Sequence, residues 1–160
     1  MAIDTNREWA VRPGKTIKLQ HAFEMLGEIE HKTGHDKKMA LWTYGKVTPL
    51  SFLLSLNFHS GICLDLPEGM PPLHPKEMDN VTHPDLIGSL SASIHRLKNC
   101  MPQAKNIKQF KKEDIFIQVL LSCPLKDAEI LCSCKDGALE ELYPSITPEL
   151  VKEIFPAYIG

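Results

Sequence analysis

Apolar residues recur at three- and four-residue steps in several parts of this chain, and this spacing defines one face of a helix. One such stretch predicts a helix from Thr16 to Thr33, in which Thr16 can cap the start. Gly34 can adopt the left-handed conformation that often follows a helix end. A second helix is predicted from Pro84 to Cys100 by the same stepping. The apolar positions are Leu19, Ala22, Phe23, Leu26 and Ile29 in the first stretch, and Leu86, Leu90, Ile94 and Leu97 in the second.

Two Thr-Pro pairs predict further helix starts, because threonine caps a helix and proline suits the first helical position. Thr48-Pro49 precedes a run that is apolar on more than one face and is closed by Gly61. This run is typical of a buried helix. Thr147-Pro148 opens another predicted helix, which Pro156 stops.

The segment from Glu113 to Cys123 fits two structures. Its early acids suit a helix N-terminus, whereas its β-branched and aromatic residues suit a strand. We favour the helix, so the predicted fold is mainly α, with four to six short helices and long irregular, Pro-rich connections. The alternative is an α+β fold with a small sheet made of residues 62–65, 115–121 and 128–134.

A proline-rich loop is predicted over residues 66–81, because four prolines and a glycine between residues 67 and 75 exclude a helix. Such a loop is either an adaptable binding surface or a connector packed onto the core, and we favour the connector. Its apolar residues and those beside it are Leu64, Leu66, Met70 and Leu73. Residues 1–14 are predicted to form an N-terminal arm, followed by a single globular domain over residues 15–160.

Composition places the chain among ordinary globular proteins. It has 160 residues, of which 43% are hydrophobic and 24% are charged, so wholesale disorder is excluded. No apolar run approaches the roughly 18 residues of a membrane-spanning helix, and the N-terminus lacks the pattern of a signal peptide. We therefore expect a cytoplasmic protein that has no membrane partner.

Charge is balanced overall but uneven along the chain. The net charge is −2, yet no acid lies between Asp85 and Glu113. This interval holds a basic stretch, residues 96–112, and one aromatic residue, Phe110. Its cations predict binding of nucleic-acid phosphates or of an acidic protein partner. The candidate binding residues are Arg96, Lys98, Lys105, Lys108, Lys111 and Lys112.

The five cysteines, an odd number, do not suggest a disulfide framework. Reduced and mostly buried thiols are the ordinary interpretation. Cys123 lies beside a proline turn and Cys134 beside a lysine, which favours exposure of these two. The others are Cys63, Cys100 and Cys132.

No residue set meets the requirements of a familiar cofactor or metal site. Gly14-Lys15-Thr16 matches only the tail of a phosphate-binding loop, since Trp9 stands where the earlier glycine is needed. His31 and His35 have the spacing of two ligands on one helix face, but Gly34 interrupts the helix between them. We therefore expect no cofactor and no metal.

These observations favour a non-enzymatic intracellular interaction or regulatory module, with a protein partner or a second copy of the chain as its ligand. The first alternative is a nucleic-acid-binding protein that uses the basic stretch 96–112. A small cysteine-dependent enzyme is the least favoured alternative, because the sequence has no nucleophile motif.

Overall fold

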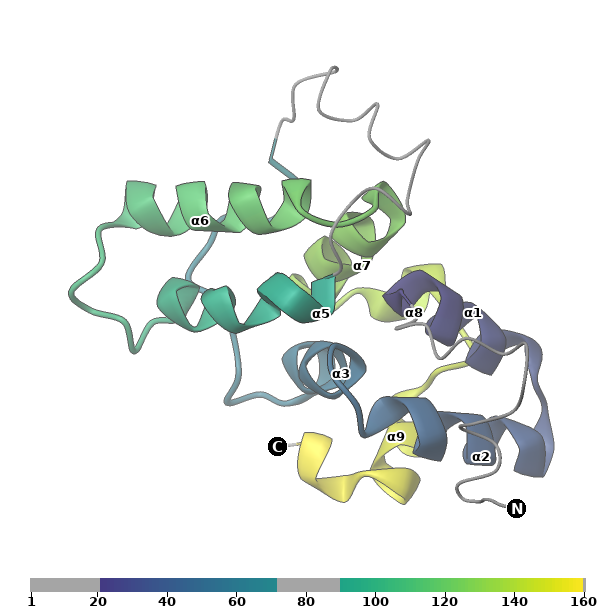
Figure 1. Ribbon diagram of the computed structural model, residues 1–160. Coiled ribbons are helices and arrows are strands. Elements are labelled where there is room, and N and C mark those ends of the chain that lie inside the picture. Colours follow the sequence, from purple (N-terminus) through teal and green to yellow (C-terminus); the bar gives the residue numbers. More distant parts are fainter. Residues whose placement is uncertain (1–20, 72–89, 160) are drawn as a thin grey trace, which may run out of the picture.

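A computed structural model describes residues 21–71 and 90–159, and this part of the chain is mainly helical (Figure 1). Its α-helices are α1 (Ala22–His31), α2 (Gly34–Gly45), α3 (Leu50–Phe58), α5 (Leu90–Ser93), α6 (Gln109–Leu121), α7 (Leu125–Lys135), α8 (Leu139–Leu142) and α9 (Pro148–Ile154). Two 3₁₀-helices complete the set, η3 (Ile94–Cys100) and η4 (Pro156–Tyr158). The predicted N-terminal arm and Gly14-Lys15-Thr16 lie outside the described residues.

The mainly α prediction is confirmed, whereas its helix count is too low and the α+β alternative is wrong. The described residues contain eight α-helices and no strand. Residues 115–121 belong to α6, residues 128–134 belong to α7, and residues 62–65 are irregular. In α6 the buried residues are Lys112, Ile115, Phe116, Val119 and Leu120, which is helical spacing, so burial on one side decides against a strand.

Helix α7 lies at the centre of the packing. It contacts α1, α3, α6 and α8, and most of its residues are buried. Its exposed side is narrow and carries Lys126 and Glu129, while the polar residue Asp127 is buried with the apolar ones, so the sequence shows no clear apolar face. Figure 1 shows α7 between the α5–α6 pair and the group formed by α1, α2 and α9.

A carboxylate on α7 caps the first described helix. Asp127 is fully buried and accepts hydrogen bonds from the backbone N–H groups of Ala22 (3.2 Å) and Phe23 (2.8 Å). Glu24 adds a local contact, because its Oε1 accepts from the His21 backbone N–H at 2.9 Å. The start of α1 is thereby satisfied partly by its own turn and partly by a distant helix.

The two Thr-Pro pairs have different outcomes. Thr147 caps α9 as predicted, because its Oγ1 accepts a hydrogen bond from the Leu150 N–H at 3.2 Å. Thr48 does not cap α3, since Pro49 is the cap residue and no side chain bonds the first turn. Gly34 has the predicted positive φ, +57°, at the junction of α1 and α2.

The segment from α5 to α6 forms a helical hairpin (Figure 1). The second predicted helix ends at Cys100 as expected, but its last seven residues form the 3₁₀-helix η3. Its predicted start at Pro84 lies outside the described residues. Within the described ranges, no helix is long and apolar enough to cross a membrane.

Candidate interaction site

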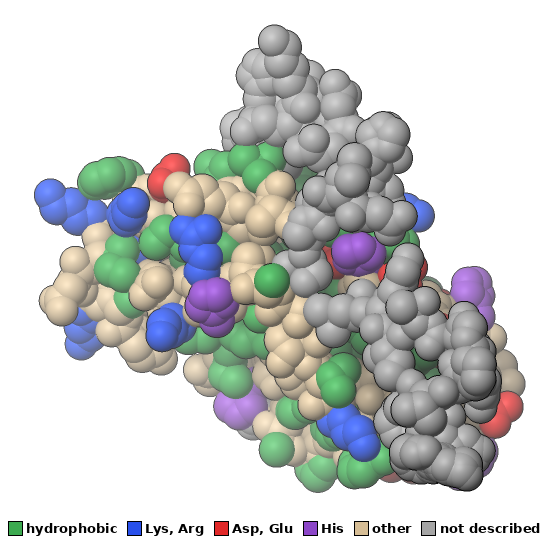
Figure 2. Space-filling model, in the orientation of Figure 1, with side chains coloured by type: hydrophobic (Ala, Val, Ile, Leu, Met, Phe, Trp, Pro, Cys, Tyr) green, Lys and Arg blue, Asp and Glu red, His purple; other side chains and the backbone are tan. Residues whose placement is uncertain are grey.

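Four of the predicted basic residues gather around one end of the hairpin, where η3 leads through residues 101–108 into α6. Lys98, Lys105, Lys108 and Lys111 are exposed there. Arg96 lies further along the hairpin, is half-buried, and its Nη2 donates to Oε1 of Gln118 in the C-terminal half of α6 at 2.7 Å. Figure 2 shows Lys and Arg side chains spread over this part of the molecule. We call these five cations the basic end.

The basic end also carries the most exposed aromatic side chain among the large hydrophobic residues described. Phe110 is 69% exposed and stands between Lys108 and Lys111 on the first turns of α6. No aromatic ring in the described ranges stacks on it. The ring is therefore accessible to a ligand.

Lys112 does not belong to the basic end, although the sequence analysis grouped it there. Its side chain is buried, and its Nζ lies 2.9 Å from Asp65 Oδ2 and 3.0 Å from the Met101 carbonyl oxygen. On α6 its position follows Lys111 by 100°, which turns it from the solvent toward η3. The structure therefore assigns Lys112 to internal stabilisation and leaves five cations for a ligand.

The ion pair of Lys112 is one of several bonds that fix the irregular segment after α3. The Asp65 N–H donates to the Cys100 carbonyl at 2.7 Å, and Gln109 Nε2 donates to the Asp65 carbonyl at 3.0 Å. Further along, Lys135 Nζ donates to the Pro67 carbonyl oxygen at 2.7 Å. Residues 65–67 are thus held by η3, α6 and α7 together, without regular secondary structure of their own.

One more bond fixes the turn of this segment. The Gly69 N–H donates to Asp136 Oδ2 at 2.9 Å, and Gly69 has a φ of +85°. A side chain at this position would be strained, because only glycine adopts positive φ readily. Asp136 Oδ1 also lies 2.6 Å from Lys135 Nζ, so the same ion pair orients both bonds to the segment.

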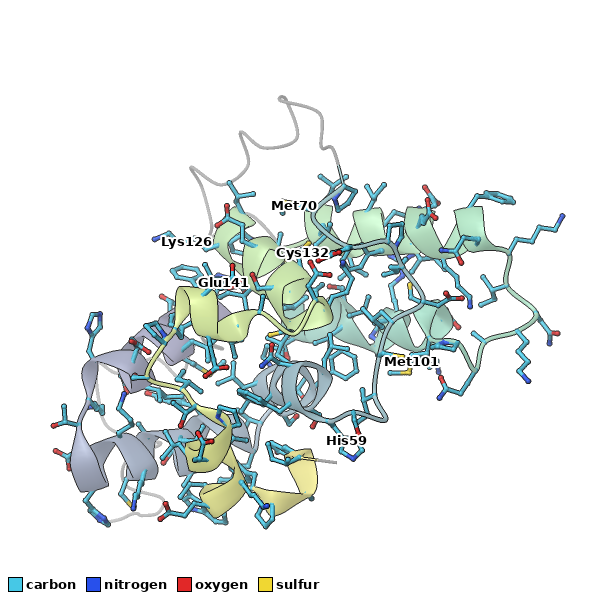
Figure 3. All side chains as sticks on the ribbon, turned by 180° about the vertical axis from the view of Figure 1, so that it is seen from behind. His59, Met70, Met101, Lys126, Cys132 and Glu141 are labelled. Atoms are coloured by element: carbon cyan, nitrogen blue, oxygen red, sulfur yellow. The ribbon has the colours of Figure 1, made fainter. Side chains whose placement is uncertain are left out.

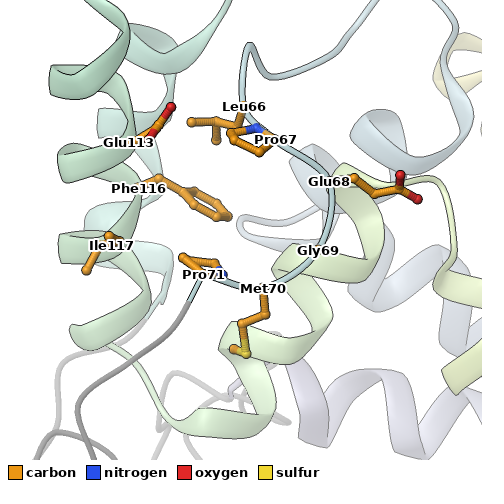
Figure 4. A pocket seen from close by; sticks show the side chains of 9 residues that line it. All are labelled: Leu66, Pro67, Glu68, Gly69, Met70, Pro71, Glu113, Phe116 and Ile117. Atoms are coloured by element: carbon orange, nitrogen blue, oxygen red, sulfur yellow. The ribbon is translucent and has the colours of Figure 1, made fainter.

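The fixed segment and α6 enclose a cavity of about 340 Å³ (Figure 4). We call this cavity the loop pocket. Figure 4 shows the Phe116 ring projecting from α6 toward the segment, with Leu66 and Pro67 on one side and Pro71 on the other. Its lining residues are Leu66, Pro67, Glu68, Gly69, Met70, Pro71, Glu113, Phe116 and Ile117.

The loop pocket combines apolar walls with negative charge. Glu113 lies on its α6 side, where it accepts a hydrogen bond from Gln109 Nε2 at 3.1 Å and forms no ion pair with a described cation. Glu68 is exposed, and Figure 4 shows its carboxylate directed away from α6. Met70 keeps 38% of its surface exposed. The pocket therefore suits an apolar group that is accompanied by a positive charge.

The sequence indicated part of this pocket through the apolar residues around the proline-rich loop. Leu64 packs in the core and Leu66 packs against it, as a connector requires, while Met70 remains accessible. Leu73 lies outside the described residues. The α6 residues of the pocket gave no signal in the sequence, because their meeting with residues 66–71 depends on tertiary packing.

Four of the five thiols are buried, and this includes Cys123 and Cys134, for which the sequence favoured exposure. Burial raises the pKa of Cys100 to about 11, that of Cys123 to about 12 and that of Cys132 to about 11. The pKa of Cys134 is raised as well, also by burial. Figure 3 shows Cys132 on α7 among the side chains of neighbouring helices. Thiols with raised pKa values are poor nucleophiles.

The histidines and acids do not assemble into a metal site in the described part of the chain. No three of its His, Cys, Asp or Glu residues are grouped so that they could hold an ion. His31 ends α1 and His35 belongs to α2, so the two do not share one helix face. The exposed positions of both agree with surface histidines.

Comparison with known proteins gives a family without a known activity. Neither the curated proteins nor the solved structures contain a match to this chain. A family model matches residues 25–141, a range that includes the basic end and the loop pocket. The chain therefore belongs to the family described as "Family of unknown function (DUF6433)".

Proposed function

We propose that this protein is a non-enzymatic interaction module that holds a partner protein through the loop pocket. The observation that carries the proposal is the fixation of an irregular segment by buried cations beside an apolar cavity. Lys112 bonds Asp65, and Lys135 bonds the Pro67 carbonyl. These bonds hold the segment in one conformation beside the pocket.

Fixation matters for binding because a rigid pocket loses little conformational entropy when its ligand arrives. The bonds to Asp65, Pro67 and Gly69 involve η3, α6 and the C-terminal end of α7, so the segment is positioned before any partner binds. Met70 and Pro71 then present apolar surface opposite α6. Methionine adapts its shape to a ligand, which suits a pocket of this kind.

The chemistry of the loop pocket defines its ligand. An apolar side chain can fill the space beside Phe116 and Ile117, and a neighbouring lysine or arginine can reach Glu113. We therefore expect a partner segment in which a leucine or phenylalanine is flanked by basic residues. The buried thiols and their raised pKa values favour this function over a cysteine-dependent enzyme.

A methyl-labelled sample tests the proposal by NMR. The protein is titrated with a short acetylated peptide that has one phenylalanine between lysines, and then with a matched peptide that has glutamates instead. We expect the methyl resonances of Met70 and Ile117 to shift with the basic peptide and to remain in place with the acidic peptide. Isoleucine methyl groups far from the pocket, such as that of Ile146, serve as internal controls.

A pair of variants sharpens this test. Met70→Lys removes apolar surface and adds a repelling charge at an exposed position, so it should weaken binding of the basic peptide at least about tenfold. Leu142→Lys makes the same change at an exposed residue of α8 and should leave binding unchanged. The proposal is wrong if both peptides shift the same resonances equally, or if neither shifts them.

A further inference from the structure

The loop pocket and the basic end both include residues at or on α6, but they have no residue in common. We infer that the basic end is a binding site for single-stranded nucleic acid. Its five cations contact the phosphates, and Phe110 stacks on one base. This inference is independent of the proposed function, because it concerns a different ligand and different residues.

The first argument is the state of the cations. Lys98 lies on η3, Lys105 lies in the connection, and Lys108 and Lys111 lie at the start of α6. None of these four forms an ion pair with an acid of the described ranges. Cations that lack protein partners carry a counterion atmosphere, and its release on phosphate binding drives association.

The second argument concerns the hydrogen-bond partners of the nearest acids. Glu113 and Asp114 follow Lys111 by two and three residues, within one turn of α6. Gln109 Nε2 donates to Glu113 at 3.1 Å, and Gln118 Nε2 donates to Asp114 at 2.8 Å. Both acids keep their charge, but neither forms an ion pair with a lysine of the basic end in the described ranges, so these lysines remain available.

The third argument selects a single strand over other polyanions. Phe110 exposes 69% of its surface between two lysines, at a place where no described ring stacks on it. Unpaired bases offer a flat aromatic face to such a ring, whereas a duplex hides its faces in the stack. A polypeptide with acidic side chains only, such as polyglutamate, would satisfy the cations but would leave the ring in water.

Fluorescence anisotropy with a labelled oligothymidylate of about 16 nucleotides tests the inference. If all five cations contact phosphates, the slope of log affinity against log salt should be about −3.5. Affinity should then fall about a hundredfold between about 50 and about 200 mM salt. A duplex of the same length and polyglutamate are measured as competitors, and both should compete less well than the unlabelled oligothymidylate.

Three variants assign the residues. Lys105→Glu/Lys108→Glu/Lys111→Glu should abolish binding, whereas Lys46→Glu/Lys126→Glu/Lys152→Glu should retain it, although the net charge changes equally. Lys112 is kept out of the first variant because it is buried and paired. Phe110→Ala should weaken binding about 5- to 150-fold without changing the salt slope. Circular dichroism verifies that each variant is folded.

Four results would overturn the inference. The first is the absence of oligothymidylate binding at low salt, and the second is an equal loss in the two triple variants. The third is unchanged affinity in Phe110→Ala, which would show that Phe110 does not stack on a base. The fourth is stronger competition by polyglutamate than by oligothymidylate, which would identify an acidic protein as the ligand of the basic end.

Discussion

Lys112 and Asp65 form an ion pair that is buried at one end only. The lysine side chain is 4% exposed, while the aspartate side chain is 47% exposed. The two residues are separated by 47 positions in the chain, and the pair joins α6 to the segment after α3. Because the solvent reaches only one partner, the two halves of the pair should not contribute equally to stability.

This asymmetry predicts that Asp65→Ala destabilises the protein more than Lys112→Met. The first change leaves a buried ammonium with one carbonyl partner and should cost about 2–3 kcal/mol of unfolding free energy. The second leaves an aspartate that water can solvate and should cost about 1 kcal/mol. Urea denaturation of both variants measures the difference, and the reverse order would contradict the asymmetry.

Because Asp127 caps α1, two substitutions at this position should differ in their effect on stability. Asp127→Ala removes the acceptor for Ala22 and Phe23 and should cost about 1–2 kcal/mol. Asp127→Asn keeps an oxygen for one of these N–H groups and should cost less. Thermal unfolding of the two variants is the measurement, and equal costs would mean that packing rather than capping explains the loss.

The same carboxyl group predicts a pH dependence. Burial raises the pKa of Asp127, and the hydrogen bonds from Phe23 and Ala22 offset this only in part. The folded state therefore holds this proton to a higher pH than the unfolded state does. The protonated Asp127 contributes fully to the free energy of unfolding below the ordinary pKa of a carboxyl group. This contribution is lost as the pH rises from there through the pKa of Asp127 in the folded state.

Asp127→Asn should flatten this part of the pH profile, because it removes the ionisation. Unfolding free energies are compared between about pH 4 and pH 7. Both proteins also carry His21→Gln, since His21 Nδ1 lies 3.8 Å from Asp127 Oδ2 in the unmodified chain. A profile that is unchanged by Asp127→Asn would assign the pH dependence to other groups.

The burial of four thiols predicts a simple labelling pattern. Iodoacetamide at neutral pH should modify Cys63 in the native protein, because it is the exposed cysteine. All five cysteines should react after unfolding. Intact-mass spectrometry counts the labels, and Cys63→Ser should abolish native labelling. Rapid native labelling of Cys100 or Cys132 would contradict their burial and their raised pKa values.

Two threonines that look alike in the sequence should respond differently to alanine. Thr147→Ala removes the cap bond to the Leu150 N–H and should cost about 1 kcal/mol. Thr48→Ala should cost much less, because no side-chain bond caps α3. Urea denaturation compares the two, and equal costs would show that the Thr147 bond contributes little.

These contrasts show what a sequence pattern can reveal. Thr147-Pro148 and Thr48-Pro49 carry the same local signal, yet only the first becomes a capped helix start, since the second begins at Leu50. The periodic helix face of α1 was visible because one side stays polar. Helix α7 was not predicted because its buried side includes the polar residue Asp127, which obscures the apolar face.

The candidate sites divide in the same way. The cations of the basic end fall within one short stretch of the sequence, so the stretch could be recognised by its charge. The ion pair that holds Lys112 depends on Asp65, which lies 47 residues earlier. The loop pocket needs Phe116 and Ile117 of α6 opposite residues 66–71. Contacts between distant segments produce no periodic pattern in the sequence. The sequence therefore indicated the loop but not the α6 residues on the opposite side of the pocket.

The cap that Asp127 provides to α1 also bears on how the chain is made. The ribosome synthesises α1 before α7, and Asp127 lies 105 residues after Ala22. At about 5–20 residues per second, that carboxylate follows roughly 5 to 20 seconds later. During this interval α1 lacks its contact with α7 and the part of its cap that Asp127 supplies. The N-terminal half of the protein should therefore reach its native form only after α7 has been synthesised.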